Sequence, residues 1–255
     1  MQLKVQIKTL AGHHIEEFIQ CPYKFYQRQI KARKQRLADW RDFVGVTVHK
    51  VVKEYYLKAP YERSSYLILK LIEKYWSELS PDLFQSQIHY YEVLASVSDY
   101  LLAFLMSEWQ DDTPLFVYEK YGVYVPELET NISLLIDAAY WSGSSYEVTK
   151  FLLDDQLEVK EMMTAFIVVF TKHAFNRVPK AIHFYSLLTG RRETVHIEPE
   201  DYSQSIRKLK MMKDILEEPK FFQKTASIEE CRNCPLRFEC STGSDIQAEK
   251  LTMLI

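Results

Sequence analysis

The spacing of four cysteines constrains this chain more than any other feature. Cys21 stands alone, whereas Cys231, Cys234 and Cys240 are grouped in the run ECRNCPLRFEC. A C-x2-C pair directs two thiolates at one ion, the third thiolate lies within reach of the same ion, and Cys21 is left to complete four ligands. We therefore expect the segments around residues 21 and 231–240 to meet at one inorganic centre.

Two identities are open for this centre. Thiolates from four cysteines hold 4Fe–4S clusters, whereas structural zinc sites also accept four cysteines. Zinc ribbons usually present two close pairs, so the three-plus-one spacing favours a 4Fe–4S cluster, with zinc as the alternative. Disulfides are disfavoured in a reducing cytoplasm.

The composition is typical of a globular protein. Hydrophobic residues make up 47% of the 255 positions and aromatic residues 14%, which excludes a disordered chain. Apolar runs stay well short of the roughly 20 residues that span a bilayer, and the first residues lack the apolar stretch of a signal peptide. We expect a cytoplasmic protein with no membrane partner. The net charge of −3 argues against a basic coat over the whole surface.

Hydrophobic periodicity divides the chain into helical and strand-rich parts. Helical spacing predicts helices over 13–30 with a break near Pro22, over 43–58, in two pieces over 63–110, over 156–175 and over 200–217. Short β-branched and aromatic segments predict strands at 115–125, 131–141, 145–152, 180–188 and 193–197. The resulting order, β-β-β-α-β-β with helices before and after it, predicts an α/β fold around a mixed sheet.

The segment IEEFIQCPYKFY, the C-x2-C-x5-C run and the mixed sheet between them resemble the iron–sulfur-containing RecB-like nucleases of the PD-(D/E)XK superfamily. Similar proteins are the nuclease domain of the bacterial AddB helicase-nuclease subunit and the CRISPR-associated RecB-like exonucleases. The resemblance covers roughly residues 10–242 and implies a restriction-endonuclease-like mixed sheet with a large N-terminal helical insertion. On this interpretation residues 1–255 form one nuclease-like domain. Its parts are an N-terminal helix and basic connector (1–42), a helical region (43–112), the sheet core (113–218) and an Fe–S-binding tail (219–255).

The resemblance also implies the site residues. His49, in GVTVHKVV, and Asp137, in LLIDAAYW, would bind Mg²⁺ or Mn²⁺, and Glu119, Asp137 and Lys150 would be catalytic. Such ions polarise a phosphodiester and activate water, and a nearby lysine offsets the charge that develops in the transition state.

The sequence departs from the family pattern at four positions. Val148 stands where the family has a carboxylate, and valine cannot bind a cation. Leu134 replaces a glycine, Met162 a glutamine and Phe166 a tyrosine.

An active enzyme would need another acid in place of Val148. Strand alternation points Glu147 to the face opposite Val148 and Lys150, unless a bulge re-aims it. The candidate substitutes are Glu147, Glu158 and Glu161.

Basic and aromatic residues alternate between positions 23 and 41. This combination suits a single strand, because cations meet phosphates while rings stack on bases. A solvated charged connector is the alternative interpretation. The predicted DNA contacts are Lys24, Arg28, Lys31, Arg33, Lys34 and Arg36.

Three functions follow, in order of preference. The first is a metal-dependent DNA exonuclease or end-processing nuclease that acts on single strands or ends, together with a helicase or another recombination or defence protein. The second is a catalytically inactive nuclease fold that binds DNA or serves as a scaffold. The third is a zinc-stabilised interaction domain.

Overall fold

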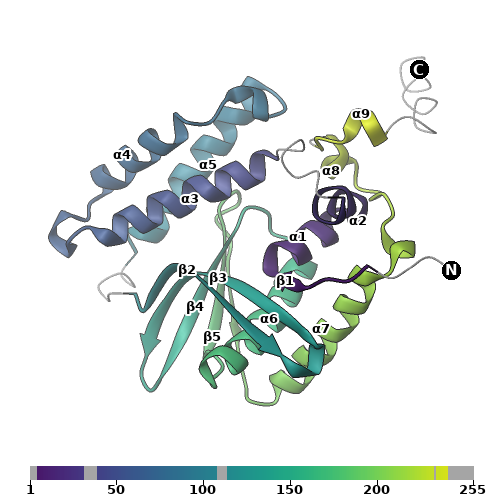
Figure 1. Cartoon of the computed structure of the whole chain (residues 1–255). Helices are drawn as coiled ribbons and strands as arrows, with labels where there is room; N and C mark the ends of the chain where they lie inside the picture. Colours follow the sequence, from purple (N-terminus) through teal and green to yellow (C-terminus); the bar gives the residue numbers. More distant parts are fainter. Residues whose placement is uncertain (1–4, 32–38, 108–113, 233, 241–255) are drawn as a thin grey trace.

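The computed structural model describes residues 5–31, 39–107, 114–232 and 234–240. A mixed sheet lies between two helical layers, with α3, α4 and α5 over one face and α6 and α7 over the other (Figure 1). The α/β fold with a mixed sheet is therefore confirmed. In the described part of the chain, no helix combines the length and apolarity needed to cross a bilayer.

The first segments form a broken helix, as predicted. β1 (Thr9–Ala11) leads into α1 (Gly12–Gln20), and the chain is extended at Cys21 before α2 (Pro22–Phe25) and a π-helical turn, η1 (Tyr26–Ile30). Pro22 begins α2 because proline is tolerated in a first helical turn and disrupts a helix interior. The three-residue strand β1 was not expected from the sequence.

The helical region agrees with the predicted spacing. Its helices are α3 (Trp40–Leu57), α4 (Ser65–Trp76) and α5 (Gln87–Leu105). Short 3-10 turns lie between them, η3 (Pro60–Glu62) and η4 (Pro81–Leu83). The apolar stripes of these helices pack together and against one face of the sheet. They form one of two hydrophobic cores, called the second core below, which includes Val48, Leu71 and Val97.

The sheet core follows in the predicted order. Its elements are β2 (Phe116–Val125), η6 (Pro126–Leu128), β3 (Thr130–Ser142), β4 (Ser145–Leu152), α6 (Leu157–Phe175), β5 (Ala181–Ser186), β6 (Arg192–His196) and α7 (Asp201–Glu217). Helix α6 crosses over between the parallel strands β4 and β5. The other hydrophobic core, called the first core below, lies between the sheet and α6. Phe166 and Phe170 of α6 are fully buried in it, together with Ile15 of α1.

Strand β3 has a fork along one of its edges. β2 pairs with β3 from residue 130 to 139 and occupies the other edge throughout. β1 pairs with 131–133 and β4 with 138–142, so these two strands share the remaining edge and leave 134–137 between them. Asp137 therefore lies where β1 and β4 separate.

The C-terminal described segment packs beside the first helices. It contains η7 (Pro219–Phe221), α8 (Ile228–Arg232) and α9 (Arg237–Cys240), which lie near α2 in Figure 1. The Tyr23 amide donates to the Gln223 carbonyl at 3.0 Å, and the Tyr26 ring stacks on Phe222 with centroids 4.9 Å apart.

Candidate functional site

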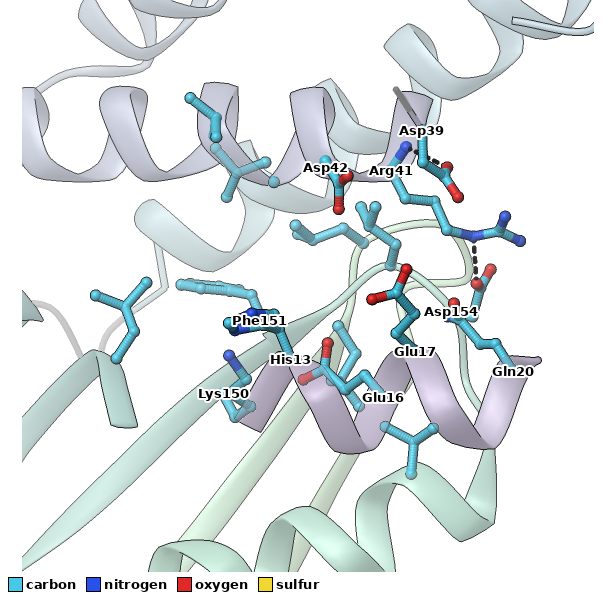
Figure 2. Close-up of a pocket in the computed structure, with 18 of the residues that line it drawn as sticks. His13, Glu16, Glu17, Gln20, Asp39, Arg41, Asp42, Lys150, Phe151 and Asp154 are labelled. Atoms are coloured by element: carbon cyan, nitrogen blue, oxygen red, sulfur yellow. Dashed lines mark hydrogen bonds and ion pairs between the residues drawn. The ribbon is translucent and has the colours of Figure 1, made fainter. Parts of the chain in front are cut away.

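A cavity of about 470 Å³ opens at the fork, between α1 and α3. Its lining includes His49 from α3 and Asp137 and Lys150 from the sheet, which are three of the predicted site residues. Figure 2 shows Glu16 and Glu17 of α1 on one side of it and Asp42 of α3 on the other.

Asp137 is held by the neighbouring strand. Ala138 pairs with Thr149, so the same register places Asp137 opposite Lys150. Its carboxylate accepts the Phe151 backbone N–H at 2.9 Å and the Lys150 ammonium at 3.2 Å. Burial raises the pKa of Asp137 above its usual value, although Lys150 and the Phe151 N–H oppose the rise. The backbone thus fixes a buried carboxylate whose charge is incompletely compensated.

Glu16 is the acid that sequence reasoning missed. It lines the cavity from α1, and its electrostatic partners are Lys150, Asp137 and Asp42. Burial raises the pKa of Glu16, Lys150 opposes the rise, and Asp137 adds to it. The pKa of Lys150 is raised despite burial because Asp137 and Glu16 both stabilise its charge. Lys150 therefore contacts Asp137 and also interacts electrostatically with Glu16.

His49 reaches the cavity from α3, where it stacks on Tyr118 with ring centroids 4.2 Å apart. Burial and Lys53 lower the pKa of His49, which favours the neutral imidazole that metals bind. Tyr118 has a positive φ of 48°, a conformation that is rare and strained for a bulky residue.

Glu119 does not reach the cavity. It pairs with Ile136 in the sheet, and Tyr118 takes the place beside Asp137. The Glu119 side chain is exposed and accepts a hydrogen bond from Tyr121. The geometry therefore does not support its predicted catalytic position.

The proposed substitute acids also lie elsewhere. Glu147 contacts His183 Nε2 at 2.8 Å on the next strand, whereas Glu158 is exposed on α6. Glu161 is exposed and lies 3.9 Å from Lys208. Val148 is 2% exposed and packs in the first core, as does Phe166. Met162 is partly buried against that core, and Leu134 is part of it.

Two of the predicted DNA-binding cations form ion pairs with carboxylates of the protein itself. Lys24 is 3% exposed and its ammonium lies 2.9 Å from Asp39. Arg28 is 4% exposed and is paired with Glu17 at 2.8 Å and with Asp42. A phosphate would have to displace these carboxylates. Lys31 is exposed beside the Tyr26 ring, and Arg33, Lys34 and Arg36 lie outside the described residues.

The four cysteines are not paired in disulfides. Burial raises the pKa of the Cys234 thiol to about 11, and the thiols of Cys21 and Cys240 add to the rise. Burial also raises the pKa of Cys240, with contributions from Cys21 and Cys231. Cys21 is thus near enough to affect the ionisation of Cys234 and Cys240.

Neither group of residues is a complete metal site as it stands. Within the described ranges, no three His, Cys, Asp or Glu side chains are grouped so that they could hold an ion. The donor types nevertheless fit the expected groups, because four thiols suit a 4Fe–4S cluster or zinc and carboxylates with an imidazole suit Mg²⁺ or Mn²⁺.

One comparison with known protein families supports the nuclease-like fold. Residues 9–122 match the family model described as the PD-(D/E)XK nuclease superfamily. A solved structure titled "Crystal structure of SSO0001" is similar with 10% sequence identity and a TM-score of 0.41, over 93% of this chain and 87% of that one. None of the curated proteins matches the chain.

Proposed function

We propose that this chain is a RecB-like, divalent-metal-dependent nuclease that cleaves DNA at the fork cavity. The observation that carries the proposal is the pairing of Asp137 with Lys150 inside a cavity that Glu16 also enters. Glu16 supplies from α1 the carboxylate that Val148 cannot supply from β4.

Asp137, Glu16 and His49 would hold Mg²⁺ or Mn²⁺. Carboxylate oxygens and a neutral imidazole are suitable donors, and the two acids already share the positive charge of Lys150. A bound ion supplies polarisation of the scissile phosphate and activation of water. The Phe151 N–H keeps Asp137 oriented, and the Lys150 ammonium stabilises negative charge that builds up on the phosphate.

The four cysteines would hold a 4Fe–4S cluster, with zinc as the alternative. The effect of Cys21 on the ionisation of Cys234 and Cys240 supports a shared centre. Its role in this proposal is structural: it fastens α8 and α9 to the segment between α1 and α2. The metal content of protein purified without oxygen distinguishes iron and sulfide from zinc.

DNA is the proposed substrate, as a single strand or an end. The superfamily match over 9–122 and the exposed Lys31 beside Tyr26 support this choice. A helicase or another recombination or defence protein is the proposed partner, by resemblance alone.

Glu16→Gln tests the proposal most directly. Labelled single-stranded and duplex DNA are incubated with the metal-loaded protein in Mg²⁺ and then in Mn²⁺. We expect cleavage by the wild type, a loss on the order of 10²-fold or more in Asp137→Asn, and a loss of about 10–100-fold in Glu16→Gln.

Glu147→Gln is the matched control, because it removes a carboxylate of β4 that lies outside the cavity. It should cleave like the wild type. If Asp137→Asn and Glu16→Gln both cleave DNA as fast as the wild type, the active site lies elsewhere.

A non-catalytic DNA-binding scaffold is the second candidate. The observation that favours it is the burial of Val148 in the apolar core at the family's carboxylate position. Binding of DNA without cleavage in either metal would establish this alternative.

A further inference from the structure

Arg41 joins three parts of the molecule at the rim of the cavity. It lies in the first turn of α3, and its side chain is 12% exposed. Its Nε donates to Asp154 at 2.9 Å, and its Nη2 lies 3.4 Å from Glu230. Figure 2 shows the side chain reaching from α3 to Asp154.

One branch of this network leads to the C-terminal cysteines. Glu230 precedes Cys231 in α8, and its side chain is 9% exposed. The same carboxylate oxygen also accepts from Gln156 Nε2 at 3.3 Å. The docking of α8 therefore depends on groups from α3 and from the loop after β4.

A second branch leads to Cys21. The Lys24 amide donates to the Cys21 sulfur at 3.4 Å, and the Lys24 ammonium lies 2.9 Å from Asp39 Oδ2. The other oxygen of Asp39 accepts the Arg41 backbone N–H at 3.0 Å. Cys21 and the segment of Cys231 are thus both connected to Arg41 through polar groups that are buried or partly buried.

The third branch leads to the catalytic strand. Asp154 and Gln156 lie in the loop that follows β4, the strand that carries Lys150. Arg41, Asp154 and Gln156 all line the cavity. Although burial opposes the charge, Asp154 and Glu230 raise the pKa of Arg41, so its guanidinium stays charged and needs both carboxylates.

We propose that Arg41 is a positioning residue that couples the docking of the cysteine segment to the order of the β4 loop at the cavity. A planar guanidinium can bind Asp154 and Glu230 at once, which a lysine ammonium does with poorer geometry. When α8 leaves, Arg41 and Gln156 lose the acceptor that they share, and Arg41 is left with Asp154 alone to hold the loop. The coupling itself does not depend on the proposed function. Only its expected effect on DNA cleavage rests on that function.

Hydrogen–deuterium exchange of the metal-loaded protein tests the coupling without an activity assay. We expect Glu230→Ala to increase exchange in 226–232 and, in addition, to raise the exchange rate of 150–157 by about tenfold. Arg41→Lys should give the same two changes to a smaller extent. Arg191→Lys is the control, because Arg191, an exposed residue between β5 and β6, pairs at 2.9 Å with Asp155 of the same loop and not with Glu230.

Unchanged exchange over 150–157 in Glu230→Ala, with increased exchange over 226–232, would overturn the proposal. An equal rise over 150–157 in Arg191→Lys would also overturn it, because the loop would then respond to any nearby change. These outcomes do not depend on whether the wild type cleaves DNA. If it does, the cleavage rate of Glu230→Ala should fall in step with the loss of protection over 150–157.

Discussion

The cavity and the cysteine segment differ in what holds their functional groups. In the cavity, strand pairing places Asp137 beside Lys150, and a backbone N–H of β4 binds the Asp137 carboxylate. In the cysteine segment, the three thiols lie on or beside helices of five and four residues, and Cys231 is exposed. Short helices have little stability of their own. The comparison teaches that the cavity is organised by the sheet, whereas the order of the cysteine segment depends on docking and on the metal it is proposed to bind.

Cys21→Ser should separate the two regions most strongly. Loss of one thiolate should abolish stoichiometric iron binding and remove stabilisation on the order of several kcal/mol from the docked segment. We expect exchange over 226–240 to approach that of an unfolded chain, while β3 and β4 remain protected. Iron analysis and hydrogen exchange measure both effects.

Asp137→Asn is the counterpart of Cys21→Ser and should keep whatever iron the wild type binds. If Cys21→Ser retained full iron, Cys21 would not be a ligand, and the shared centre would be wrong.

Asp39→Asn tests the point where the two regions meet. Removing its charge leaves Lys24 buried without a full partner, and we expect a loss of about 3–5 kcal/mol in unfolding free energy near neutral pH. Although burial opposes it, the ion pair with Lys24 lowers the pKa of Asp39 below 3.8. A lowered pKa means that the stabilisation is present above 3.8 and is lost as the pH falls through the folded value.

Urea unfolding at neutral and acidic pH checks this prediction. The difference between the wild type and Asp39→Asn should shrink in acid. A difference of the same size at both pH values would show that the charge of Asp39 contributes little.

The pH dependence of cation binding should be the smallest of the three effects. Burial raises the pKa values of Asp137 and Glu16, so these acids keep their protons to a higher pH than exposed acids do. A cation must displace those protons in order to bind. We expect Mn²⁺ affinity to fall by up to about tenfold per pH unit for each acid as the pH drops through these raised values.

Stability without a cation should show the opposite sign. An acid with a raised folded pKa stabilises the fold below its unfolded pKa, and this contribution is lost as the pH rises through the folded value.

Mn²⁺ titration at several pH values should show a weaker pH dependence of the Mn²⁺ affinity in Glu16→Gln than in the wild type. An affinity that does not change with pH would show that neither acid binds the ion.

Much of the fold could be predicted because it follows from periodic patterns. The apolar stripe of α3 and the alternating residues of β2 repeat often enough to identify each element. β1 has only three residues and exists through its pairing with β3, so its own sequence shows no period.

The site was harder to predict because it depends on tertiary neighbours. Glu16 belongs to the polar face of an amphipathic helix, which normally faces solvent, and only the packing of α1 beside the fork places it in the cavity. Its one sequence signal is that His13, Glu16 and Gln20 share a helical face. Lys24 and Arg28 are buried because their acidic partners come from other segments.

The contact between Arg41 and Glu230 spans 189 residues of sequence and bears on the order of events during folding. A long loop must close before this contact forms, and such closures are slow. The antiparallel pairs β2–β3 and β3–β4 can assemble from nearer neighbours beforehand. The Arg41 network should therefore be completed late in folding, and its opening should be an early step when the protein unfolds.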